Sequence, residues 1–132
     1  MSRILSIVLL VSICIHGQDV VIVSDKNFPF NTLKKDEIKA FFLNKRSLIK
    51  KQRVLVMNHE YGDDIRICFE KVILHKTKKS LERYWRKAYY QGYKPPKVIK
   101  SNSMLLSYLQ HVSPAIGYID SSKLQSKDVK VL

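Results

Sequence analysis

The sequence has no apolar run long enough to cross a lipid bilayer comfortably. Its longest run, residues 4–15, is roughly 12 residues, whereas a spanning helix needs about 20. A short positive segment ending at Arg3 precedes it, and Gly17 follows as a small residue suited to signal peptidase. We therefore expect residues 1–17 to be a cleaved signal peptide and the protein to be periplasmic or secreted, not integral to the membrane. Two alternatives stay open, an uncleaved N-terminal anchor and a lipoprotein attached at Cys14, the second disfavoured by the bulky residue before that cysteine.

Cysteine is nearly absent, with Cys14 and Cys68 as its two occurrences. Cys14 leaves with the signal peptide, so we expect Cys68 to remain without a partner and the protein to have no internal disulfide. Because Cys68 falls on the apolar face of a predicted helix, a small core residue is its best interpretation. The four histidines show no ligand spacing and no cysteine accompanies them, so we predict no metal site and no cofactor.

Acidic residues are scarce as well, with 11 Asp and Glu against 24 Lys and Arg, for a formal net charge of +13. Removal of residues 1–17 takes away one cation, Arg3, and leaves 23 cations against 11 acids, or +12. Such a balance favours anionic partners, which include phosphate-bearing small molecules, lipid headgroups and envelope polyanions. A merely solvated basic surface is the competing interpretation. We expect no nucleic-acid partner, because a secreted protein does not meet one in the cytosol.

The centre of the chain, residues 34–74, alternates between helical and extended periodicity. Residues 34–45 carry Ile38, Phe41 and Phe42 at the i, i+3, i+4 spacing of one helix face. Residues 54–57 form a short apolar run that is typical of a buried strand, and residues 58–64 form a polar turn. A second amphipathic helix follows, with apolar residues at i, i+3, i+4, i+7 and i+8: Ile65, Cys68, Phe69, Val72 and Ile73.

The remaining segments continue the alternation. We predict strands over residues 19–24, 98–99, 115–120 and 129–132. Two more helices are predicted, one from Thr77 to a stop at Gly92 and one capped by Ser101. Trp85 keeps helical spacing, which favours core packing over a stacking platform for a ligand. Strands that alternate with helices, with no repeat, low-complexity segment or linker, predict one α/β domain over residues 18–132.

Five ordered segments together resemble the substrate-binding proteins of phosphate ABC transporters, and more closely their short, stand-alone relatives. They are Leu33–Lys45, Val54–Val56, Gly62–Phe69, Tyr84–Lys97 and Pro114–Tyr118. The set extends over nearly the whole chain from Val20 to Asp120. The resemblance implies a single periplasmic-binding-protein-like lobe, in which helices flank a mixed sheet, and it implies a secreted protein without catalytic activity.

The candidate ligand-binding residues lie at the turn before the second helix: His59, Gly62, Asp63, Asp64 and Arg66. Gly62 and Arg66 match positions in the short relatives, and a helix start offers unpaired backbone N–H groups to an anion. The resemblance implies small or hydroxyl residues where this chain has Asp63 and Asp64. Like charges about 4 Å apart repel by roughly 4 kcal/mol at an effective dielectric near 20, so these carboxylates oppose a phosphate. The alternative interpretation is helix capping by Asp63, with Arg66 paired to a nearby acid.

Three classes of function follow from the sequence. The first is a binding module that recognises a small anion of the phosphate class or passes it to a partner, such as an envelope or transporter protein. The second is an interaction module that docks through its basic surface to an envelope protein or polyanion without a small ligand. An enzyme is the third and the least favoured, because adjacent Asp63 and Asp64 diverge at a helix start and no catalytic residues are predicted.

Overall fold

The computed structural model describes Cys14, residues 19–124 and residues 129–132. A mixed sheet of five strands forms its centre, in the order β5-β4-β6-β1-β7. The strands are β1 (Val20–Asp25), β4 (Leu55–Asn58), β5 (Lys97–Val98), β6 (Ala115–Asp120) and β7 (Val129–Val131). A separate hairpin pairs β2 (Leu48–Ile49) with β3 (Gln52–Arg53). This architecture confirms the predicted α/β class.

Strand direction divides the sheet into two parts. β4 runs parallel to both β5 and β6, whereas β1 runs antiparallel to β6 and to β7. The carboxyl ends of β4, β5 and β6 therefore meet at one edge of the sheet. The predicted ligand-binding turn follows Asn58 at that edge.

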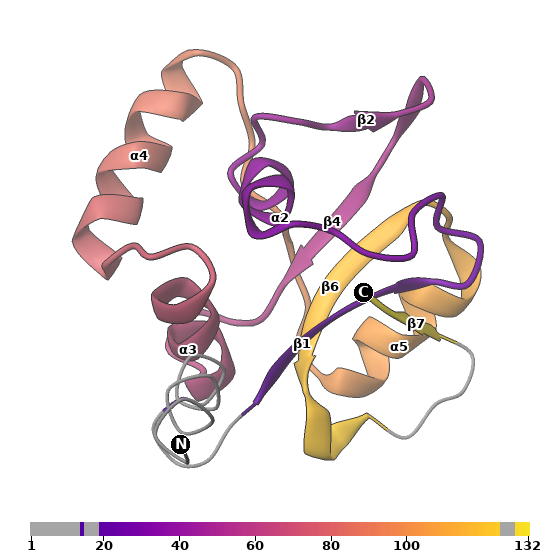
Figure 1. The fold of residues 1–132 in the computed structure, drawn as a ribbon. Coiled ribbons are helices and arrows are strands. Elements are labelled where there is room, and N and C mark those ends of the chain that lie inside the picture. The colour runs from indigo at the N-terminus through magenta and orange to yellow at the C-terminus, as the bar shows by residue number, and fades with distance from the viewer. Residues whose placement is uncertain (1–13, 15–18, 125–128) are drawn as a thin grey trace, which may run out of the picture.

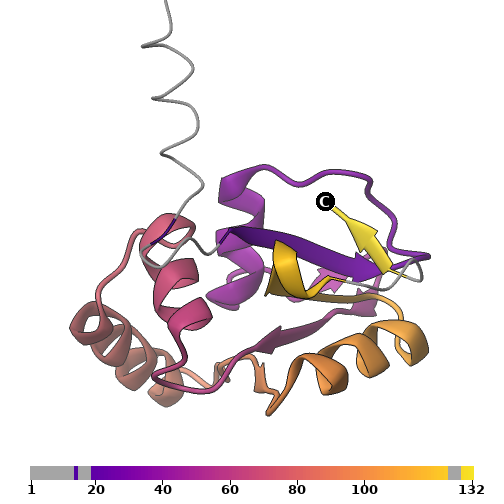
Figure 2. The same ribbon diagram turned by 90° about the horizontal axis from the view of Figure 1, so that it is seen from below.

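Helices cover both faces of the sheet. They are α2 (Lys35–Phe42), α3 (Asp64–Val72), α4 (Lys78–Tyr90) and α5 (Asn102–His111), and a 3-10 turn, η2 (Ser121–Lys123), follows β6. Figure 2 shows α2 on one side of the strands and α5 on the other. Figure 1 shows α4 as the outermost helix, beyond α2 and α3 and away from the sheet.

The alternation of side chains along β6 builds two hydrophobic cores. Ile116 and Tyr118 face the core formed with α2, α3 and Leu81 of α4, whereas Ala115 and Ile119 face the core under α5. Successive strand residues point to opposite faces, so a one-residue shift in register would exchange the two sets. Trp85 is partly buried against the first core, which confirms the core-packing interpretation.

The prediction of an unpaired Cys68 differs from the structure. Cys68 is buried on α3, as expected for a core residue, but it forms a disulfide with Cys14. The expectation assumed that Cys14 is lost with the signal peptide, whereas here Cys14 is present and pairs with Cys68. The helix-start prediction also needs refinement: Asp63 occupies the position that precedes α3, but its side chain makes no capping hydrogen bond.

Candidate functional site

The turn between β4 and α3 is built on a glycine in the left-handed conformation. Gly62 has φ +91°, a backbone conformation that L side chains rarely adopt. The Asp63 N–H donates to the Glu60 carbonyl at 3.1 Å, and the Ile67 N–H donates to the Asp63 carbonyl at 3.0 Å. This geometry starts α3 directly after the turn and places Asp63 and Asp64 at its N-terminus, where both residues are exposed.

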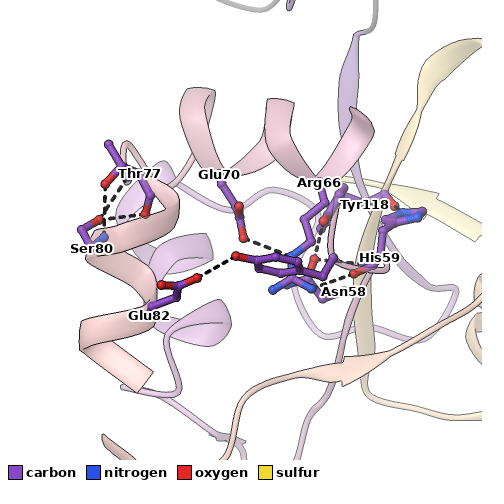
Figure 3. Close-up of polar contacts among 9 residues, drawn as sticks. Asn58, His59, Arg66, Glu70, Thr77, Ser80, Glu82 and Tyr118 are labelled. Carbon is purple, nitrogen blue, oxygen red and sulfur yellow. Dashed lines mark hydrogen bonds and ion pairs between the residues drawn. The ribbon is translucent and has the colours of Figure 1, made fainter. Parts of the chain in front are cut away.

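Arg66 is held by groups of the protein itself. Its Nε donates to Glu70 Oε2 at 3.0 Å, and its Nη1 donates to the His59 carbonyl at 3.0 Å (Figure 3). The Tyr61 ring centroid lies 5.2 Å from the guanidinium carbon, close enough for a cation–π contact. The side chains of Arg66 and Glu70 are 16% and 13% exposed, so the ion pair is largely shielded from water. Of the alternative interpretation, the pairing of Arg66 with a nearby acid is therefore confirmed, whereas the capping of α3 by the Asp63 side chain is not found.

His59 and Asn58 connect the turn to the middle of β6. The buried His59 ring donates from Nε2 to the Tyr118 carbonyl at 2.7 Å, and the His59 N–H donates to Asn58 Oδ1 at 2.9 Å. The Tyr118 hydroxyl also donates to Asn58 Oδ1. The Tyr118 ring stacks on Phe69 of α3, with ring centroids 3.9 Å apart and an interplanar angle of 2°. These contacts join β4, β6 and α3 into one rigid unit.

Burial controls the ionisation of this cluster. It lowers the pKa of His59 from its usual 6.5, and the charge of Arg66 lowers this pKa further. The hydrogen bond to Tyr118 and the Asp63 carboxylate act in the opposite direction and raise the pKa of His59. Burial also raises the pKa of the Tyr118 hydroxyl far above its usual value. Both side chains are consequently neutral near pH 7, and in this form they serve as hydrogen-bond donors to protein oxygens. Neither is presented to solvent as an acid or a base.

The five predicted residues are thus close in the structure but do different things. His59 is buried and Arg66 is paired inward, whereas Gly62, Asp63 and Asp64 are exposed on the outer side of the turn. The contact between Asn58 and Tyr118 was not predicted, because it links residues 60 positions apart and has no local signal in the sequence. The role of Glu70 was not predicted either, although its i, i+4 spacing from Arg66 is the usual signal for a helical ion pair.

Neither a membrane-spanning helix nor a metal site is found in the part of the chain that the structure describes. Over Cys14 and residues 19–124 and 129–132, no helix has the length and apolar character that crossing a bilayer requires. The same residues contain no group of three or more His, Cys, Asp or Glu side chains placed to hold a metal ion.

Two solved structures have the same fold. An ABC-type phosphate transport receptor from Vibrio cholerae superposes with a TM-score of 0.67 at 19% identity, and the match covers 86% of this chain and 44% of the receptor. A putative phosphate ABC transporter substrate-binding protein from Clostridium perfringens, solved with bound phosphate, gives 0.69 at 19% identity, with 86% and 43% covered. No protein-family model and no curated protein sequence matches the chain.

These similarities define the fold as a single lobe of the periplasmic-binding-protein type. The chain spans less than half of the length of either phosphate-transport protein. Within this fold, the turn from Asn58 to Asp64 lies where three parallel strands end. Open α/β sheets bind their ligands outside the carboxyl ends of the strands, so this edge is the candidate site.

Proposed function

We propose that the chain is a secreted, non-catalytic recognition module that binds an anion of the phosphate class or passes it to a partner protein. The observation that carries the proposal is the fold, which over 86% of the chain is that of two proteins of phosphate transport. The net charge of +13 favours an anionic ligand. The α3 N-terminus, with its unpaired N–H groups, lies at the edge of the sheet where such folds hold ligands.

The pairing of Arg66 determines how such a site would work. Glu70 and the His59 carbonyl already accept hydrogen bonds from the Arg66 guanidinium. Asp63 and Asp64 add negative charge at the same helix start. Binding proteins of the two-lobed kind close two lobes around the ligand, and this chain has the length of one. The described residues form one lobe, so we propose that a ligand at this turn also contacts a cation from a second lobe that these residues do not include.

A thermal-shift titration of the exported protein tests this proposal. Phosphate, pyrophosphate, sulfate and a phosphonate are compared at two salt concentrations. A ligand at 100 times its dissociation constant adds about 2.7 kcal/mol to the free energy of unfolding. A shift that one anion produces and that salt does not remove supports the proposal. A shift common to all anions and lost in salt, or no shift at any protein concentration, refutes it.

The Asp63→Ser variant localises the site within the protein. Serine is also a residue type that can cap a helix, and the change removes one carboxylate, so we expect phosphate to bind more tightly than in the unmodified protein. Asp36→Ser is the control, because Asp36 is an exposed aspartate near the start of another helix, α2. A gain in both variants would indicate a general effect of charge rather than a site at Asp63.

The second candidate is an interaction module that docks through its basic surface to an envelope protein or polyanion. The exposed side of α4 favours it, since Tyr89 and Tyr90 are 73% and 85% exposed there and Arg83, Arg86 and Lys87 are exposed beside them. Tyrosine and arginine are enriched at protein interfaces. A partner captured from envelope extract should then resist added phosphate but dissociate as salt rises. Capture that phosphate abolishes would instead support the first candidate.

A further inference from the structure

A hollow of about 310 Å³ lies at the amino-terminal end of β4, the opposite end from the Gly62 turn. Three segments line it: the chain after α2, the start of β4 and the stretch before β5. Figure 1 shows the chain that leaves α4 running past α2 on its way to β5. The Asn44 side-chain amide fixes this arrangement by donating to the Lys94 carbonyl at 3.0 Å.

Four cations surround this first hollow, namely Arg46, Arg53, Lys94 and Lys97, and no acid is present among the described residues that line it. Arg46 is held in place, with its guanidinium carbon 5.0 Å from the Phe41 ring centroid. Its nearest paired carboxylate, on Glu37, is 3.9 Å away and partly exposed, which makes a weak ion pair. The other three cations are exposed.

A second hollow, of about 450 Å³, adjoins the first at Asn44, which lines both. Lys45 and Lys87 bring two further cations, and the described residues of its lining again include no acid. The Tyr84 hydroxyl donates to the Leu43 carbonyl at 2.6 Å and so ties α4 to the end of α2. Because that bond, the Asn44 bond and the two prolines before Lys97 fix the walls, the hollows are formed before any ligand arrives.

We propose that the two adjoining hollows bind a small molecule that carries a chain of two or more phosphate groups. Six cationic residues, and no acid among the described lining residues, favour a ligand that carries more negative charge than a single phosphate. Two of the six have partners of the protein: Arg46 is weakly paired with Glu37, and Lys97 Nζ lies 5.5 Å from the Tyr108 ring centroid. Arginine binds phosphate through a planar fork and lysine binds it as a point charge, so both types suit this ligand. The Pro95–Pro96 wall leaves an apolar surface for an organic group on the chain. This site is independent of the proposed function, because it lies at the other end of β4.

Titration calorimetry on the full chain at 0.15 M salt tests the site with orthophosphate, pyrophosphate and tripolyphosphate. The proposal predicts at least a hundredfold tighter binding of tripolyphosphate than of orthophosphate. A nucleoside triphosphate is then compared with tripolyphosphate. If the nucleoside triphosphate binds more tightly, the site also recognises an organic group; if the two affinities are equal, the site recognises the phosphate chain alone. Equal binding of orthophosphate and tripolyphosphate overturns the proposal.

Two double variants with the same change in net charge separate a site from a diffuse basic surface. Arg53→Gln with Lys94→Gln should weaken tripolyphosphate binding at least tenfold. Lys79→Gln with Lys123→Gln removes two exposed cations outside both hollows and should leave the affinity unchanged. Equal losses in the two variants overturn the proposal. All four side chains are exposed, and thermal unfolding of each variant verifies that it folds.

The Asp63→Ser variant keeps this site distinct from the one at the Gly62 turn. It should leave tripolyphosphate affinity unchanged, since Asp63 lines neither hollow. A chain that binds tripolyphosphate but gains no orthophosphate affinity from Asp63→Ser would keep the cationic site and lose the proposed site at the Gly62 turn. The reverse result would keep the site at the turn and remove the cationic site.

Discussion

Replacement of Glu70 by glutamine is the most informative perturbation of the candidate site. Glu70→Gln keeps the shape of the side chain but removes the charge that Arg66 faces at 3.0 Å. Arg66 retains the His59 carbonyl and the Tyr61 ring as partners. We expect the variant to fold, to be less stable, and to leave the Arg66 guanidinium available to an external anion.

The exposure of the two side chains sets the magnitude of this loss. An exposed helical i, i+4 pair contributes about 0.3–0.5 kcal/mol, and breaking a fully buried pair costs about 3–5 kcal/mol. At 16% and 13% side-chain exposure, the Arg66–Glu70 pair lies between these limits. Loss of a hydrogen bond to a charged group costs about 1.5–3 kcal/mol, so we expect about 2 kcal/mol. For a domain of this size that lowers Tm by roughly 8 °C.

Urea and thermal unfolding of four proteins measure the effect: the unmodified chain, Glu70→Gln, Arg66→Met and the double variant. A coupling energy of about 1–2 kcal/mol is expected from this cycle. Glu60→Gln is the control, because Glu60 is an exposed glutamate near the same turn. If Glu70→Gln costs no more than Glu60→Gln, the pair does not stabilise the site. Phosphate should stabilise Glu70→Gln more than the unmodified chain; equal effects would show that the pairing of Arg66 does not close the site.

Two further predictions concern the neighbouring core. Burial lowers the pKa of His59 in the folded state, so below pH 6.5 the unfolded chain binds more protons than the folded chain. The free energy of unfolding should therefore fall as the pH drops from 6.5 towards the pKa of His59 in the folded state. Urea unfolding between pH 5 and 8 should show that His59→Gln removes this part of the slope. Gly117→Ala should cost about 1 kcal/mol, since its Cβ would lie 2.6 Å from Leu105 Cδ1, and Leu105→Val in the same chain should recover part of that loss.

The periodic segments could be predicted from the sequence because each one carries its own pattern. The sequence predicts a strand over residues 115–120, and β6 has the same bounds. The helix predicted from Thr77 begins one residue later, and Thr77 is its N-cap, with its hydroxyl accepting from the Ser80 N–H. Local periodicity and capping chemistry are properties of neighbouring residues, so a single sequence contains them.

The candidate site could be predicted only in part, because its decisive contacts are long-range. The turn residues were found, but the Tyr118 contacts that bury His59 come from a strand 59 positions away. The β2–β3 hairpin was missed for a different reason. It has two residues in each strand, and Lys50 and Lys51 at its turn adopt positive φ values of 49° and 68°, where glycine or asparagine is the usual signal. The cationic hollows have no local signal in the sequence, because their lysines and arginines come from four separate segments.

The cysteine pair gives a direct test of the proposed signal peptide. Cleavage after Gly17 removes Cys14, so the Cys14–Cys68 disulfide belongs to the uncleaved chain. We expect the exported protein to begin at Gln18 and to contain one thiol that reacts only after denaturation, because Cys68 is buried. Intact-mass measurement with thiol labelling decides this.

A retained, oxidised Cys14 would instead close a loop with a sequence separation of 54. On the chain-entropy model such a crosslink contributes about 4 kcal/mol, so reduction, or Cys14→Ser, would lower the free energy of unfolding by that amount. In a chain cleaved after Gly17, reductant should leave the stability unchanged, and Cys68→Ser should cost only the burial of one hydroxyl. A reductant-sensitive Tm in the exported protein would therefore refute the cleaved signal peptide and favour the uncleaved N-terminal anchor.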